Sequence, residues 1–114
     1  MADIFLSSSD ADAAAAARLA QGLAREGYAL AGAIEGARAV IVLWSEAAAR
    51  SAQVRADAER ARSARTLVQL SADGRRPPMP FSQLHFVSLV GWQGEADHPG
   101  WARAKESLRL LLSR

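Results

Sequence analysis

An uninterrupted run of six apolar residues, AVIVLW at 39–44, constrains the fold more than any other feature of the sequence. A strand with one face in water alternates apolar and polar side chains, whereas a strand covered on both faces does not. The run therefore predicts a central strand of a parallel sheet. Ser45 and Glu46 end it, and no apolar segment of the sequence approaches the length of a membrane span.

Shorter segments around this run alternate between strand-like and helix-like patterns. Further strands are predicted at 4–6, 28–30, 66–70 and 85–89. Helices are predicted from Ser9 to Gly27, from Ser45 to about Ser63, and from about Pro99 onward. Strands that alternate with helices form a doubly wound parallel sheet, so the predicted fold class is α/β.

The length and composition indicate one domain. The 114 residues are half apolar, which is enough for a single core, and the domain is predicted to span 1–114. The lack of cysteine excludes a disulfide scaffold, thiol catalysis and thiolate metal sites. No basic leader precedes Asp3, so a cytoplasmic location is expected. The ending LRLLLSR is compatible with a fragment of a longer protein.

The charges are nearly balanced. The formal net charge is +2, and the arginines are scattered along the chain. A nucleic-acid-binding protein usually gathers its cations on one face, together with aromatic side chains. The nearest approach to a cluster is Arg55, Arg60, Arg62 and Arg65, which a solvated helix face explains. We therefore expect neither a nucleic acid nor a membrane as a partner.

Several chemistries of parallel sheets are excluded by missing motifs. No G-x-G-x-x-G follows the first strand, and the single lysine, Lys105, lies in the last predicted helix, so a dinucleotide cradle and a P-loop are both excluded. The central strand ends in Trp44-Ser45, without the aspartate that a receiver domain phosphorylates. His85 and His98 are far apart in the sequence, and no metal site is predicted.

Five segments, taken in order, resemble a Toll/interleukin-1 receptor (TIR) domain of the bacterial kind. They are DIFLSSSD at 3–10, the central strand that closes in Trp-Ser at 44–45, and the segments 51–58, 74–78 and 89–92. The likeness covers nearly the whole chain. It implies a flavodoxin-like parallel sheet of the TIR type, with a reduced second strand and helix.

The resemblance also implies where a functional site would lie. In this family the turn after the first strand lines a cleft, where active members cleave NAD with a glutamate of the third helix. Asp57 matches the position of that glutamate and is the candidate catalytic residue. The candidate residues for NAD binding are Ser7, Ser8, Ser9, Asp10, Trp44, Ser45 and Trp92. For Trp44, as for Trp101, core packing is the alternative interpretation.

The chain departs from the family at several of these positions. Asp57 is one methylene shorter than glutamate, and a misplacement on that scale can cost about 100-fold in rate. Gln53 stands where the family usually has tryptophan, and Ser8 where many relatives have an aromatic residue. A solvated helix position is therefore the alternative interpretation of Asp57.

The connection before the central strand is also short. Residues 31–37 leave no room for the dozen or more residues of an ordinary parallel crossover. The second strand is therefore predicted to be rudimentary, or the connection to pass unusually tightly. The family uses the missing loop over the cleft and in head-to-tail assembly, so its loss weakens both inherited functions.

These observations favour a TIR-like signalling module that acts through self-association, as a homo-oligomer, or through contact with another TIR-like domain. Catalysis is expected to be weak or absent, and no bound cofactor is expected. The alternative is an NAD nucleosidase with NAD as its substrate and Asp57 as the carboxylate that stabilises an oxocarbenium-like transition state. A third interpretation is a scaffold whose activity resides in a partner.

Overall fold

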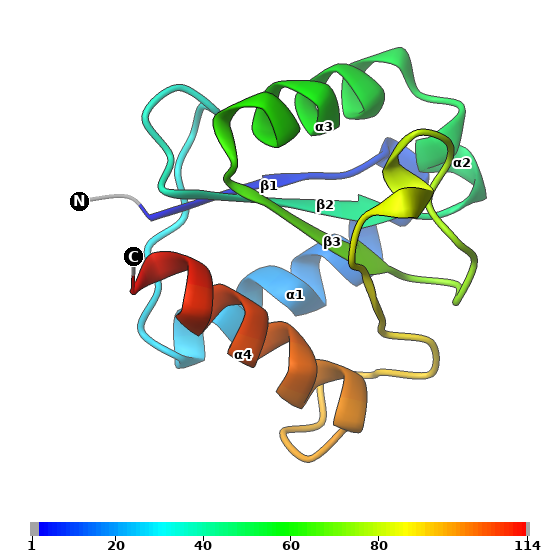
Figure 1. Cartoon of the computed structure of the whole chain (residues 1–114). Helices are drawn as coiled ribbons and strands as arrows, with labels where there is room; N and C mark the ends of the chain where they lie inside the picture. The colour runs from blue at the N-terminus through cyan, green and yellow to red at the C-terminus, as the bar shows by residue number, and fades with distance from the viewer. Residues whose placement is uncertain (1–2, 114) are drawn as a thin grey trace.

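The computed structural model describes residues 3–113, which form an open parallel sheet between two layers of helices (Figure 1). The four strands are β1 (Ile4–Ser7), β2 (Ala39–Trp44), β3 (Leu67–Ser71) and β4 (Val87–Ser88). They lie side by side in this order, and all the pairings are parallel. The predicted α/β, flavodoxin-like fold is confirmed.

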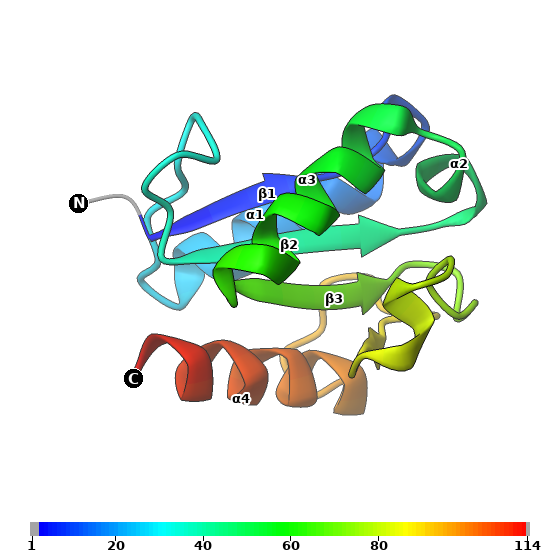
Figure 2. The ribbon, with the colours of Figure 1, turned by 45° about the horizontal axis from the view of Figure 1, so that its top comes forward.

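Helices cover both faces of this sheet. The α-helices are α1 (Ala13–Arg25), α2 (Glu46–Ala49), α3 (Ala52–Ala64) and α4 (Pro99–Leu112), and the short 3-10 turns are η1 (Asp10–Asp12) and η2 (Phe81–Gln83). Figures 1 and 2 show α3 crossing one face, with α1 and α4 on the other. No helix among residues 3–113 is both long enough and apolar enough to cross a membrane.

Every residue of β2 is buried, which explains the uninterrupted apolar run. Successive side chains of a strand point to opposite faces. Ile41 and Leu43 therefore pack in the core beneath α1 and α4, whereas Val40 and Val42 pack in the core beneath α3. The prediction of a central strand covered on both faces is confirmed.

The second strand is reduced to a single bridge, in which Leu30 pairs with Ile4 on the outer side of β1. The chain leaves this edge after the Ala31 N–H donates to the Ile4 carbonyl at 2.7 Å. It returns on the other side of β1, where the Arg38 N–H donates to the Asp3 carbonyl at 2.9 Å. The predicted rudimentary strand is confirmed.

The connection 31–38 contains no helix and instead packs against α3. Ile34 contacts the core beneath α3, and Glu35 forms a 2.6 Å ion pair with Arg60 of that helix. The short connection therefore passes the amino-terminal end of β1 on the α3 side of the sheet.

Two predicted elements differ from the structure. The helix predicted from Ser45 to Ser63 is divided, because Ser51 is extended and its hydroxyl accepts a hydrogen bond from the Val54 N–H at 3.2 Å, capping α3. The strand predicted at 85–89 is only two residues long. The Gln69 side-chain amide donates to the carbonyls of Phe81 and His85, which holds the preceding segment by side-chain rather than ladder bonds.

Candidate functional site

The serine turn and the third helix meet at the carboxyl end of β1. Ser7 is the last residue of β1, and its hydroxyl donates a hydrogen bond to Oδ2 of Asp57 at 2.8 Å. Both side chains are buried, with exposed fractions of 4% for Ser7 and 8% for Asp57. The structure therefore brings together two of the candidate residues, which are separated by fifty positions in the sequence.

The second carboxylate oxygen of Asp57 is also engaged. Gln53, one turn earlier on α3, donates from Nε2 to Oδ1 of Asp57 at 2.9 Å. A buried carboxylate is costly unless hydrogen bonds compensate for its lost hydration, and here each oxygen accepts one. Ser7, Asp57 and Gln53 therefore form a hydrogen-bonded triad, and this triad links α3 to the end of β1. No feature of the sequence predicts this role of Gln53.

A second polar pair joins the start of the α1 segment to α2. The Ser45 hydroxyl donates to Oδ2 of Asp12 and accepts from the Ala48 N–H at 3.1 Å, so Ser45 also caps α2. Ser9 caps η1 by accepting from the Ala11 N–H at 3.1 Å. These two serines thus have helix-capping roles in the structure.

The rest of the serine turn faces outward. Ser8 is half-buried and Asp10 is exposed. Neither side chain forms a hydrogen bond or an ion pair with another residue in the range 3–113. They lie at the same end of the sheet as the Ser7–Asp57 pair, because both follow the carboxyl end of β1.

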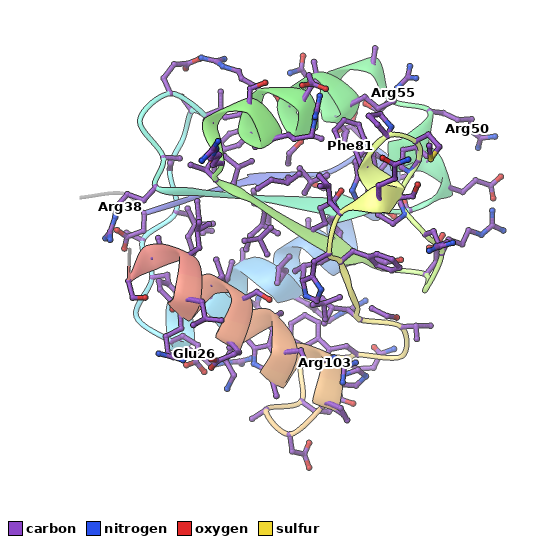
Figure 3. The ribbon with its side chains drawn as sticks, in the orientation of Figure 1. Glu26, Arg38, Arg50, Arg55, Phe81 and Arg103 are labelled. Carbon is purple, nitrogen blue, oxygen red and sulfur yellow. The ribbon has the colours of Figure 1, made fainter. Side chains whose placement is uncertain are left out.

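Trp44 lies within the core beneath α3. Its exposed fraction is 1%, its Nε1 donates to Oε1 of Gln69 at 2.8 Å, and its ring centroid lies 5.5 Å from that of Phe81. Figure 3 shows Phe81 on the same side of the sheet as α3. The ring of Trp44 therefore has a packing role in this core.

Trp92 lies on the opposite face of the sheet, so the two tryptophan candidates do not share a site. Its ring stacks on Trp101 with a centroid distance of 4.9 Å, and its Nε1 donates to the Glu95 carbonyl at 2.9 Å. The pKa of Glu95 is lowered by hydrogen bonds from backbone N–H groups, its own and that of Gln93, with a smaller contribution from His98. The loop after β4 is therefore held by the hydrogen bond from Trp92, whose ring packs on Trp101.

Sequence reasoning missed a groove of about 400 Å³ at the outer edge of β3. Its apolar lining comes from three distant segments and consists of Leu67, Val68, Leu84, Leu110 and Leu111. Arg62, Arg65 and His85 also line it, and no carboxylate does. No local motif predicts this surface, because its parts meet only when α4 packs beside β3.

The described residues contain no group of three or more histidines, aspartates or glutamates that could hold a metal ion. In comparisons with known proteins, no family model matches the sequence and no curated protein matches it.

Proposed function

We propose that this chain is a TIR-like interaction module that works through self-association or through contact with another TIR-like domain. The observation that carries the proposal is the groove beside β3. Within it, Leu84 is 40% exposed and Leu110 is 55% exposed. Large apolar side chains that gather at one exposed place, rather than singly, are typical of a surface that another protein covers.

The backbone beside the groove supports the same function. β4 pairs with β3 at Leu70 and Ser71, so no strand of the described chain pairs with the outer edge of β3 from Leu67 to Gln69. An open strand edge presents N–H and C=O groups that a second chain can bond. Apolar side chains and unpaired backbone therefore lie together at this edge.

Charge adds selectivity to the groove. Among the described residues, its lining includes Arg62 and Arg65 and no aspartate or glutamate. Arg62 is paired with Glu59 on the same helix at 2.7 Å, and this pair is about half exposed, so it is weak. A partner surface with apolar and acidic side chains would complement the groove best.

NAD cleavage is the second candidate function. One observation favours it: a carboxylate, Asp57, lies beside Ser7 at the carboxyl end of the sheet. Against it, both oxygens of Asp57 accept internal hydrogen bonds, and Asp57 lines neither the groove nor the cavity beside Trp92. A carboxylate that stabilises a substrate must face it, so the interaction module is the better supported function.

The two functions are separated by one set of samples. Sedimentation of the concentrated wild-type protein is expected to show reversible self-association, and incubation with NAD is expected to release no nicotinamide above a buffer control. Asp57→Asn, which removes the negative charge, is expected to keep the association. Nicotinamide release that is lost in Asp57→Asn would overturn the proposal in favour of the enzyme. If the protein associates neither with itself nor with a second TIR-like domain at any concentration, the proposal is overturned in favour of a scaffold whose activity resides in a partner.

A further inference from the structure

A small cavity on the α1 side of the sheet holds an arginine without a partner. The cavity has a volume of about 140 Å³ and lies at the carboxyl ends of β2 and β3, where Leu43 and Ala72 form part of its lining. Arg18 of α1 and Trp92 line it as well. In parallel α/β sheets, ligands bind outside the carboxyl ends of the strands. The position is therefore suited to a ligand.

The guanidinium of Arg18 supplies the main observation. Its Nε is the one buried side-chain nitrogen or oxygen among residues 3–113 that has no hydrogen-bond partner. Arg18 also forms no ion pair or hydrogen bond through its other nitrogens with any residue in that range. A buried donor left without an acceptor costs free energy, because it has lost its hydrogen bond to water. An acceptor from outside the chain would remove this cost.

Among residues 3–113, the lining of the cavity offers Arg18 no anion. No carboxylate lines the cavity. The nearby loop contains Glu95, whose carboxylate accepts a hydrogen bond from the Gln93 N–H and is held in its charged form there. The remaining walls include the apolar side chains of Leu19 and Leu89. The cavity thus combines an arginine whose buried Nε has no acceptor with a lining of both polar and apolar groups.

We propose that this cavity binds a small organic carboxylate. The guanidinium presents N–H groups in a planar fork that matches both oxygens of a carboxylate. The apolar part of the lining, which includes Leu19, Leu89 and the ring of Trp92, can contact a short hydrocarbon portion of the ligand. An apolar cavity of about 150 Å³ accommodates benzene, so a ligand of about six non-hydrogen atoms fits this volume.

This site is separate from the surfaces discussed above. It shares no lining residue with the groove beside β3, and it contains no residue of the Ser7–Asp57–Gln53 triad. The inference therefore goes beyond the proposed function and does not depend on it.

The test uses butyrate, which has six non-hydrogen atoms, together with butyramide as a neutral analogue of the same shape and with inorganic phosphate. Titrations at constant ionic strength are followed by the NMR signal of the Trp92 indole N–H. Butyrate is expected to shift this signal saturably, whereas butyramide and phosphate are not. Arg18→Gln is expected to weaken butyrate binding about ten- to a hundredfold, the loss of one or two charge-assisted hydrogen bonds.

Arg55→Gln is the matched control, because Arg55 is an exposed arginine on α3, across the sheet from α1 (Figure 3). It should leave butyrate binding unchanged. If Arg18→Gln does not fold, Arg18→Lys keeps the charge without the planar fork and should bind butyrate more weakly than the wild type. The proposal is overturned if butyrate causes no saturable shift, if butyramide or phosphate binds as well as butyrate, or if the two glutamine variants behave alike.

Discussion

At the scale of single residues, Asp57 decides how the carboxyl end of the sheet is interpreted. The resemblance to TIR domains assigns it to catalysis, whereas its hydrogen bonds to Ser7 and Gln53 make it a structural link between β1 and α3. The two roles predict different consequences of removing it. A link contributes to folding stability whether or not a substrate is present.

We expect Asp57→Ala to lower the free energy of unfolding by about 1–3 kcal/mol, because the buried Ser7 hydroxyl and the Gln53 amide lose their acceptor. Urea unfolding followed by circular dichroism measures the effect. Glu59→Ala is the control on the same helix. Glu59 is about half exposed, so its removal should change stability by no more than about 0.5 kcal/mol. Equal stabilities of the two variants would show that Asp57 is not a structural link between β1 and α3.

At the scale of elements, the contact between the connection 31–38 and α3 can be tested by titrating the carboxyl group of Glu35. The Arg60 guanidinium, together with a backbone hydrogen bond, lowers the pKa of Glu35. A carboxyl with a depressed folded pKa stabilises the fold above its unfolded pKa, and this contribution disappears as pH falls through the folded value. We expect Arg60→Gln to return the pKa of Glu35 toward its ordinary value in an NMR titration. An unchanged pKa would show that the connection is not tethered to α3 through Arg60.

The start of α4 depends on a glycine. A Cβ added at Gly100 would lie 2.2 Å from the Ser88 carbonyl oxygen, a backbone atom of β4 that cannot rotate away. We expect Gly100→Ala to destabilise the protein by about 1–3 kcal/mol, the usual cost of overpacking. Gly32→Ala is the control, because no atom lies within 4 Å of its added Cβ. Thermal unfolding of both variants tests the close approach of α4 to β4, and equal melting temperatures would contradict it.

An element could be predicted from the sequence when the interactions that form it leave a pattern in its own residues. The strand at 39–44 was predictable because burial on both faces leaves its mark on every residue. The break at Ser51 and the shortness of β4 were not, since they depend on one cap and on the Gln69 side chain binding a distant loop. The juxtaposition of Ser7 and Asp57 was anticipated only through the family resemblance.

At the scale of the whole molecule, the chain keeps the doubly wound sheet but leaves one edge open. β4 is too short to cover β3, and α4 stops beside that edge rather than over it, which produces the groove of about 400 Å³. At the opposite edge, Leu30 pairs with Ile4 of β1 in a single bridge. The groove could not be predicted from the sequence, because its lining comes from segments far apart in the chain.

Two substitutions, compared by sedimentation velocity over a range of concentrations, test most directly whether the groove beside β3 is the interaction surface. Leu110 in the groove and Val90 outside its lining are each 55% exposed, so Leu110→Glu and Val90→Glu add the same charge at equally exposed sites. We expect Leu110→Glu to abolish self-association and Val90→Glu to retain it, with both variants folded by circular dichroism. Association that survives Leu110→Glu unchanged would show that the groove beside β3 is not the interaction surface.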